Sequence, residues 1–378
     1  LVRKGQPWPD GGGSIMGAPE YVLNNAGQVA FWSASSSVGG VERIFRTDGS
    51  MLVEIARTGQ DAPNGSGRFS QFALGPQIND AGRVAFTGYL SSPVGGGIFL
   101  GDGTTSTQLA RYGEALLDGN GQYAGTPWFS MRLNELGHAA FFANFSNTLG
   151  GASDNTGILR GDGASLVTIV RKGQMAPDGN GAFFDFTGLG FTAPAALNDS
   201  GQVAFDARLT GTAQGNSDDY GIFRSDGATL VQVVREGQLA PDGNGRFVIH
   251  ERPALNDAGQ LAFRASLTGT SGGASDNTGI FFFDDALGLL QVVRTGDAFL
   301  GSTITALSFA PPERWGDEGS GLNKSGVPRV AYFFRLADSR EGIAVWTLVP
   351  EPTSVPLLLV AMLSMLHRRS VRPDRCTR

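Results

Sequence analysis

The sequence predicts an all-β protein, a six-bladed β-propeller of four-stranded blades, and three observations lead to this prediction. A phrase typified by LNDAGQLAF (255–263) recurs six times along the 378 residues. Within the repeats, apolar and polar residues alternate. Glycine is very frequent, at 56 residues, while only 17% of the residues are charged. Short strands joined by glycine turns have this composition, and a disordered chain would contain fewer apolar residues.

The repeated phrase sets the period of the architecture. Its glycine recurs every 55 to 67 residues, a spacing typical of repeat folds. The Asn of the phrase favours a tight turn through its side chain, and Gly adopts a positive φ without steric cost. We therefore expect the phrase to form the first hairpin of each unit. Its six glycines are Gly27, Gly82, Gly137, Gly201, Gly259 and Gly326.

Each unit contains four apolar segments, which are clearest in the fourth unit. Its second segment, QVAFDARL (202–209), alternates apolar and polar residues with the period of a strand. The alanine and the aromatic residue of the phrase fall on opposite faces, as in a sheet that is covered on both sides. Four strands in each of six units predict a propeller. The four segments are 196–198, 202–209, 220–225 and 229–236.

The two ends of the repeat region predict how the ring closes. The chain begins with LVRKG (1–5), which matches the fourth segment of other units, whereas the last unit has only three segments. We expect the N-terminal strand to complete the last blade, because closure removes exposed sheet edges. An open solenoid and a missing seventh blade of a truncated chain are the alternatives. The expected domains are a propeller over 1–348 and a tail over 349–378.

Two sets of polar loops are expected on one face of the propeller. One set joins consecutive blades with Asp-Gly-Asn-Gly, and the other joins the second and third strands with Ser-Asp-Asn-Thr or a similar run. Their oxygens suit calcium or sugar hydroxyls, but the downstream Glu of a calcium loop is absent, so solvated glycine turns are the favoured interpretation. The candidate ligand residues are Asp154, Asn155, Asp178, Asn180, Asp242, Asn244, Asp276 and Asn277. Calcium is the one cofactor considered, with Asp118, Asp178 and Asp242 as weak candidates.

Six arginines recur at the end of the fourth segment. We expect them on the outermost strand of each blade, where they would protect the sheet edge or pair with aspartates of the preceding turn. A ring of anion-binding sites is the alternative. The arginines are Arg3, Arg57, Arg111, Arg171, Arg235 and Arg294, and the turn aspartates are Asp48, Asp102, Asp162 and Asp226.

No catalytic set stands out in the sequence. GTSGG (269–273) matches a hydrolase pattern that requires a strand-to-helix turn, and here it falls in a loop of an all-β repeat. The pair His250–Glu251 and the segment 315–321 break the repeat most clearly, yet neither forms a recognisable catalytic set. The single cysteine, Cys376, excludes a disulfide within the chain. The net charge of −6 argues against nucleic-acid binding.

The tail differs in composition from the repeats. An apolar run of twelve residues (355–366) follows Pro350-Glu351-Pro352 and precedes the basic residues Arg368 and Arg369. The run is shorter than the roughly 20 residues of a comfortable bilayer span, and basic residues are typical of a cytoplasmic end. We expect a short anchor helix here, with a buried core helix as the alternative.

These tail residues resemble the PEP-CTERM sorting signal of Gram-negative bacteria. The resemblance implies export across the inner membrane, transient anchoring there, processing by an exosortase near Pro-Glu-Pro, and an association with extracellular polysaccharide. The body resembles tandem-repeat proteins with an Asn-x-x-Gly-x-x-Ala-Phe motif, whose spacing five of the six units match. The resemblance to these tandem-repeat proteins implies no enzymatic reaction.

The sequence thus predicts an exported protein of the cell surface or extracellular matrix with a binding or structural role and no evident catalytic activity. A propeller-type glycan hydrolase or lyase, with carboxylates at the channel mouth, is one alternative. A calcium-dependent adhesin is the other. Because the chain starts at Leu1 without Met, we expect either a removed leader or a fragment.

Overall fold

The computed structural model describes residues 2–17, 20–34, 40–65, 67–73, 75–91, 94–125, 131–186, 196–250, 252–309 and 321–349. These residues form 28 strands and four one-turn 3-10 helices, and no described helix is long and apolar enough to span a membrane. The expected anchor helix, the sorting residues Pro350, Glu351, Pro352, Arg368 and Arg369, and Glu251 lie outside the described residues.

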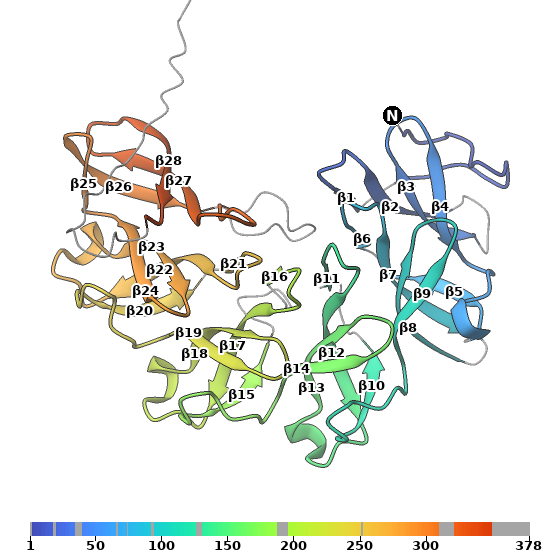
Figure 1. Ribbon diagram of the computed structural model, residues 1–378, viewed down its shortest axis with the longest axis horizontal. Coiled ribbons are helices and arrows are strands. Elements are labelled where there is room, and N and C mark those ends of the chain that lie inside the picture. Colours follow the sequence, from blue (N-terminus) through green and yellow to red (C-terminus); the bar gives the residue numbers. More distant parts are fainter. Residues whose placement is uncertain are drawn as a thin grey trace, which may run out of the picture.

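The strands make six antiparallel sheets that follow one another along the chain (Figure 1). Sheet 1 contains β1 (Tyr21–Leu23), β2 (Val29–Ala34), β3 (Glu42–Thr47) and β4 (Leu52–Arg57). Sheet 2 contains β5 (Phe69–Phe72), β6 (Gln77–Ile78), β7 (Val84–Ser91), β8 (Val94–Gly101) and β9 (Ser106–Arg111). Sheet 3 contains β10 (Gln122–Gly125), β11 (Met131–Leu133), β12 (Ala139–Ser146), β13 (Thr156–Gly161) and β14 (Leu166–Arg171).

The second half of the chain continues the same pattern. Sheet 4 contains β15 (Ala182–Asp185), β16 (Ala196–Leu197), β17 (Val203–Thr210), β18 (Tyr220–Ser225) and β19 (Leu230–Arg235). Sheet 5 contains β20 (Arg246–His250), β21 (Ala254–Leu255), β22 (Leu261–Thr268), β23 (Thr278–Asp284) and β24 (Gly288–Arg294). Sheet 6 contains β25 (Ala298–Phe299), β26 (Ser302–Ser308), β27 (Arg329–Leu336) and β28 (Glu341–Thr347). The 3-10 turns are η1 (Pro63–Gly65), η2 (Gly151–Ser153), η3 (Gly215–Ser217) and η4 (Gly273–Ser275).

The six sheets are arranged along an arc, in a propeller-like all-β fold (Figure 1). A separate apolar core fills the space between each sheet and the next. Phe205 packs in the core between sheets 3 and 4, while its neighbour Ala204 packs in the core between sheets 4 and 5. The alternation of small and large residues in the phrase therefore serves a sheet that is covered on both faces, as expected.

The first strand of sheets 2 to 5 differs from the expectation, because it is divided into two pieces. In sheet 4, β15 and β16 pair with opposite ends of the same edge of β17. The sequence predicts only the second piece, at 196–198, as a strand. The first piece, Ala182–Asp185, is only four residues long and directly follows a glycine turn, so its period of two is too brief to recognise.

The repeated phrase forms a hairpin, and its Asn also connects consecutive sheets. Asn198 Oδ1 accepts a hydrogen bond from the backbone N–H of Gln202 at 2.8 Å, and Gly201 has φ 79°. The Asn198 Nδ2 group donates to the carbonyl of Asn256, the corresponding residue of the next sheet, at 2.9 Å. The same donor and acceptor join residues 24 to 79, 79 to 134 and 134 to 198. The motif hairpins lie along the inner side of the arc (Figure 1).

The residue after this Asn provides a second connection between sheets. The backbone N–H of Asn25 donates to Asp80 Oδ1 at 2.8 Å, and that of Glu135 donates to Asp199 Oδ1 at 2.9 Å. The acidic residue of the phrase therefore accepts a backbone hydrogen bond from the preceding unit. A polar residue in an exposed turn thereby contributes to the contact between sheets.

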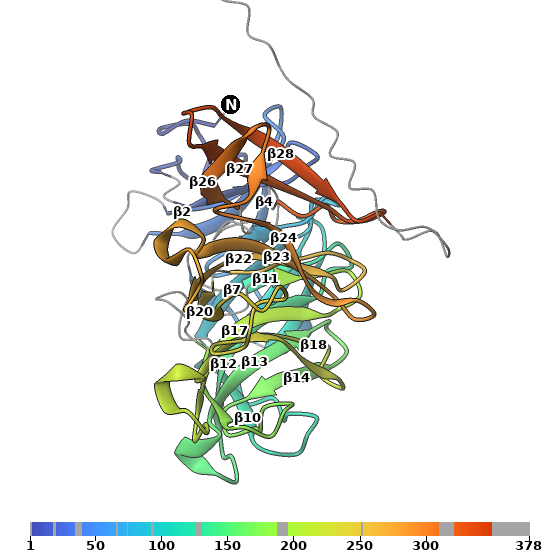
Figure 2. The ribbon, with the colours of Figure 1, turned by 90° about the vertical axis from the view of Figure 1, so that its left-hand side faces the viewer.

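The first residues of the chain and the outer strand of sheet 6 correspond to segments that are neighbours in the other sheets. Residues 3–6 have the turn geometry that follows the outer strand of other sheets, with Gly5 N–H bonded to the Ile15 carbonyl at 2.7 Å, as Gly59 is to Phe69. Among the described residues, sheet 6 has no counterpart of β24, the outer strand of sheet 5, and Ile343 on its own outer strand β28 is 75% exposed. No hydrogen bond joins residues 2–5 to β28 in the described part of the chain. Figure 1 shows these two sheets on opposite sides of an opening in the arc, and Figure 2 shows both of them at the top of the turned molecule.

Candidate functional site

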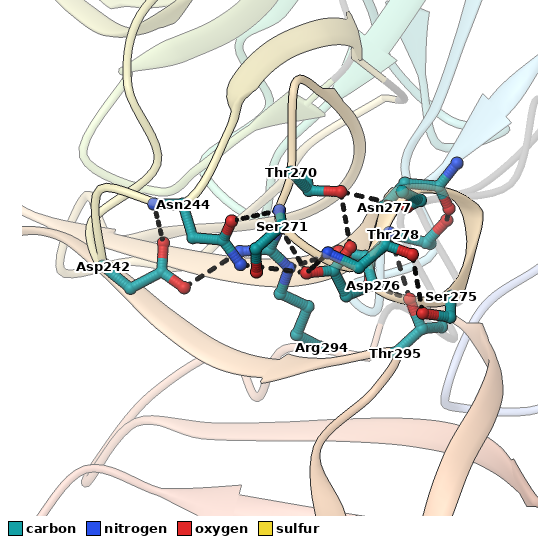
Figure 3. A network of polar contacts seen from close by, with 12 residues as sticks. Asp242, Asn244, Thr270, Ser271, Ser275, Asp276, Asn277, Thr278, Arg294 and Thr295 are labelled. Atoms are coloured by element: carbon teal, nitrogen blue, oxygen red, sulfur yellow. Dashed lines mark hydrogen bonds and ion pairs between the residues drawn. The ribbon is translucent and has the colours of Figure 1, made fainter.

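The two sets of polar loops meet at one end of sheet 5, where an arginine joins them (Figure 3). Arg294, at the end of β24, forms an ion pair with Asp242 of the loop before β20, with an Nη1–Oδ2 distance of 2.9 Å. Its Nε donates to the carbonyl of Asp276 in the loop between β22 and β23. Asn244 Nδ2 donates to Asp276 Oδ2 at 2.9 Å, which completes the network. We call this set of four residues an arginine clasp.

Sheets 3 and 4 contain the same clasp. In sheet 4, Arg235 Nη1 lies 2.7 Å from Asp178 Oδ2, and its Nε donates to the carbonyl of Asp218 at 2.6 Å. Asn180 Nδ2 donates to Asp218 Oδ2 at 2.8 Å. The corresponding residues of sheet 3 are Asp118, Asn120, Asp154 and Arg171, with an Arg171–Asp118 distance of 2.8 Å. The two loop sets therefore share one face, as expected, and the clasp holds them together.

The expected pairing of the arginines with the turn aspartates is wrong. Arg171 ends β14 and Asp162 precedes that strand, so a six-residue strand of roughly 17 Å separates them. Asp162 instead accepts hydrogen bonds within its own turn, from the N–H groups of Ala164 and Ser165 at 2.8 and 2.7 Å. Asp48, Asp102 and Asp226 accept equivalent bonds from their own turns.

The arginines also differ from one another in exposure. Arg171, Arg235 and Arg294 are buried, which contradicts their expected place at an exposed sheet edge. Arg57 is half exposed and lies 3.9 Å from Asp10, and the buried guanidinium of sheet 1 belongs to Arg43, 2.8 Å from the same carboxylate. The sequence repeat alone does not distinguish the buried arginines from the half-exposed one.

The weak calcium candidates are the aspartates that bind the clasp arginines. Asp178 uses Oδ2 for Arg235 and Oδ1 for the N–H of Asn180, at 2.9 Å. Asp118 and Asp242 have the same two partners in their own sheets. Among the described residues, no group of three or more His, Cys, Asp or Glu side chains is placed to hold a metal ion. A cation at these loops would have to displace an arginine.

The remaining ligand candidates also have protein partners. The Asn155 and Asn277 carbonyls accept backbone hydrogen bonds from Phe145 and Leu267, both at 2.7 Å. A hydrogen bond from Thr270 outweighs burial and lowers the pKa of Asp276, so this carboxylate stays ionised inside the network. The loops thus form a connected polar network, in which Asp154 Oδ1 is buried and accepts no hydrogen bond from the described residues.

Two cavities adjoin the clasps on the side of the following sheet. One, of about 640 Å³, lies between the clasp of sheet 3 and the turn 225–230 of sheet 4. The other, of about 540 Å³, lies between the clasp of sheet 4 and the residues Phe283 and Leu289 of sheet 5. We call them groove 3/4 and groove 4/5.

Sheet 4 carries a group of ionisable residues that the sequence analysis missed. Asp206 accepts a hydrogen bond from the Tyr220 hydroxyl, and burial raises the pKa of its carboxyl group. Burial, followed by the charge of Asp219, raises the pKa of Glu236 to about 7. Asp206 shares a face of β17 with Ala204, which packs in the core between sheets 4 and 5, and the alternation of the strand did not single it out. The sequence contains one indication of this group. At the position of Asp206 in the phrase the other units have no carboxylate; the residues there include Trp32, Thr87, Phe142 and Arg264.

The positions that break the repeat contribute little to this site. The side chain of His250 and residues 315–320 lie outside the described part of the structure. Ser271 of GTSGG lies in the clasp loop, where its N–H donates to Asn244 Oδ1 at 2.7 Å. Burial lowers the pKa of His138, whose backbone N–H caps the motif turn.

Comparison with solved structures gives matches of low sequence identity. An uncharacterised protein of Listeria monocytogenes EGD-e is 11% identical with a TM-score of 0.39, over 86% of this chain and 82% of that one. The α-L-arabinofuranosidase Arb93A of Fusarium graminearum is 11% identical with a TM-score of 0.31, over 87% and 91%. The β-propeller domain of the Trilobed protease of Pyrococcus furiosus, described as having an open velcro topology, is 9% identical with a TM-score of 0.30, over 87% and 96%.

Comparison at the level of families is more informative. No curated protein matches the chain. The model of the Family of unknown function (DUF7453) matches twice, over residues 1–187 and 88–356. Because the second match alone covers more than half of the sequence, the chain belongs to the DUF7453 family.

Proposed function

We propose that this protein is an exported, surface-associated propeller that binds extracellular polysaccharide and has no catalytic activity. The observation that carries the proposal is the use of the repeated polar residues. In three successive sheets the same Asp, Asn and Arg side chains are joined to one another, and they do not converge on one reactive centre. A catalytic site needs unlike groups placed once, and these equivalent groups are placed three times and bonded to one another. The choice of polysaccharide as the ligand rests on the resemblance of the tail to the PEP-CTERM signal.

The proposed location of the protein rests on the residues of its tail. Pro350-Glu351-Pro352, the apolar run and Arg368 with Arg369 support export, passage through the inner membrane and processing by an exosortase. The direct test is fractionation of the encoding bacterium. The wild-type protein should lose its tail and leave the inner membrane, whereas a triple alanine variant of residues 350–352 should stay there at full mass. Equal fractionation of the two proteins would refute the assignment of the tail.

Binding is tested with the secreted polysaccharide of the same bacterium. The purified chain should co-sediment with this polymer, and the polymer should keep its length after prolonged incubation. Loss of polymer length would favour a glycan hydrolase or lyase instead. Absence of co-sedimentation would refute polysaccharide binding.

We further propose that six blades close into a ring through the N-terminal strand. The sequence of residues 1–5, the outer-strand turn at residues 3–6 and the exposed edge of β28 support this closure. The register follows from the other sheets, where an Ile pairs with a small apolar residue of the outer strand, as Ile222 does with Val234. The same register pairs Ile343 with Val2.

A disulfide tests this register. In a chain with Cys376→Ser, the pair Val2→Cys and Ile343→Cys should oxidise within the monomer, because paired strand residues lie within the reach of a disulfide. The matched control combines Val2→Cys with Val345→Cys, which is two residues out of register. Disulfide-linked dimers, or equal bonding in the control, would contradict closure by the chain's own N-terminus.

A further inference from the structure

A cation and an aromatic ring from consecutive units meet at the surface between sheets 3 and 4. Lys172 directly follows β14, the outer strand of sheet 3, and Phe184 belongs to β15 at the start of sheet 4. The Lys172 Nζ atom lies 5.3 Å from the centroid of the Phe184 ring. We call this pair of residues the Lys–Phe platform.

A β-bulge directs the Phe184 ring towards solvent. The pairing of β15 with β17 shifts between Phe183 and Asp185, which leaves Phe184 as the extra residue of the bulge. A bulge changes the direction in which the side chain of its extra residue points. Phe183 is accordingly 1% exposed, whereas Phe184 is 50% exposed. The strand therefore holds the ring in place while half of its surface stays open to a ligand.

The positive charge of Lys172 is not paired within the described part of the chain. The lysine that forms an ion pair there is Lys324, which lies 3.1 Å from Asp199. Beside Lys172, the clasp arginine Arg171 binds Asp118 at 2.8 Å, so that carboxylate already has a cationic partner. An ammonium group has three N–H donors, and a contact with a ring face leaves donors for an anion.

The combination of these two residues occurs once among the six units. The junction between sheets 4 and 5 has the opposite charge, with Glu236 at the position of Lys172, and has Val248 at the position of Phe184. The first unit keeps the lysine, as Lys4, but has Met16 in place of the ring. The platform is thus a single site, unlike the clasp, which recurs in three sheets. The other equivalents of Lys172 are Thr58, Tyr112 and Thr295, and those of Phe184 are Ser70, Ala124 and Thr305.

The chemistry of the platform indicates an anionic sugar. The negative face of an aromatic ring attracts the C–H bonds of a pyranose, and the carboxylate of a uronic acid projects from the edge of that pyranose towards a neighbouring cation. Asp118 and Asp154 line groove 3/4, so an anion is disfavoured inside this cavity and favoured on the side of the exposed ring. We propose that the Lys–Phe platform binds a uronic acid residue of a polysaccharide, with its ring against Phe184 and its carboxylate paired with Lys172. This inference rests on the polysaccharide-binding function proposed above and adds a sugar class and a site.

The test uses the full chain and probes that differ from one another in one property. Hexagalacturonate is the anionic sugar, its methyl ester has the same rings without the charge, and a hexaglutamate peptide has the charge without the rings. Each is titrated by calorimetry at low salt, because salt screens exposed charges. The variants Lys172→Glu and Phe184→Val introduce the residues that the next unit carries at these positions, so both should fold, which thermal melting verifies.

Each variant should weaken the binding of hexagalacturonate at least fivefold, which corresponds to about 1 kcal/mol, as expected for one exposed charge pair or one ring contact. The matched control is Lys4→Glu, which makes the same charge change at the equivalent position where the aromatic ring is missing. This control should leave the affinity for hexagalacturonate unchanged.

The outcomes separate the site from the function. Binding of hexagalacturonate that neither variant weakens would refute the platform as the site while polysaccharide binding stands. Equal or tighter binding of the methyl ester would refute the anionic class of sugar, and equal binding of hexaglutamate would refute the contact with the ring. If no probe binds but the native polysaccharide co-sediments, a decrease in both variants would support the platform and unchanged co-sedimentation would refute it. If the native polysaccharide does not co-sediment either, both proposals fail.

Discussion

Replacing Arg171 by alanine tests the claim that the clasp stabilises the fold. Arg171 is 8% exposed, and its guanidinium makes an ion pair with Asp118 at 2.8 Å and hydrogen bonds to the carbonyls of Asn120 and Asp154 at 2.9 and 3.0 Å. It also lies 4.5 Å from the centroid of Phe145. Each of the two hydrogen bonds from a charged donor contributes about 1.5 kcal/mol. The ion pair adds little, because the Asp118 side chain is 37% exposed to screening water.

We therefore expect Arg171→Ala to lower the free energy of unfolding by about 3 kcal/mol. The matched control is Arg57→Ala at the same position of sheet 1, where the side chain is 48% exposed and its nearest carboxylate oxygen is 3.6 Å away. An exposed pair of this kind contributes about 0.5 kcal/mol. Urea unfolding followed by circular dichroism measures both variants. Equal losses in the two variants, or a loss below about 1 kcal/mol for Arg171→Ala, would refute the reasoning.

Three further predictions follow from the same contacts. Asn198→Ala removes a turn cap and the link to the next sheet and should cost about 2 kcal/mol in urea unfolding, whereas Asn323→Ala, at a half-buried Asn whose amide group donates, among the described residues, only within its own turn, should cost less than half of that. Because the folded-state pKa of Glu236 is raised from 4.5 to about 7, stability should fall as the pH rises through this window, and Glu236→Gln should remove about 1 kcal/mol of that fall after allowance for solvent exposure. Chelation with EDTA should leave the melting temperature unchanged, since arginines occupy the aspartates that calcium would need.

Each of these predictions has a contradicting result. Equal losses for Asn198→Ala and Asn323→Ala would show that the link between sheets contributes nothing. A pH profile of Glu236→Gln that follows the wild type between pH 4.5 and 7 would contradict the raised pKa. A lower melting temperature in EDTA, restored by calcium, would revive the calcium-dependent adhesin.

The sequence predicted the local chemistry of the hairpins better than their long-range partners. The turn formed by Asn198 and Gly201 depends on residues within five positions, so composition and spacing were sufficient. The acceptor for Asn198 Nδ2 lies 58 residues away, in the next sheet. Periodicity gives the number of units, but the distance between equivalent atoms of neighbouring units depends on how the sheets pack.

The clasp was missed for a related reason. Arg171 has Asp162 nine positions before it and Asp118 at 53 positions, and the nearer residue was the natural choice from the sequence. The strand between Arg171 and Asp162 keeps these side chains at opposite ends of the sheet. Asp206 was not singled out because alternation in a strand assigns residues to two faces without revealing their hydrogen-bond partners.

The links through the motif asparagines have an evolutionary consequence. Every link uses the same amide donor and the same carbonyl acceptor, so Asn134 would meet Asn256 as readily as it now meets Asn198. Recombination that removes one whole period therefore keeps this donor and this acceptor at the new junction between sheets. A change in the number of repeats therefore retains one hydrogen bond between sheets, and selection then acts on the packing residues that differ between units.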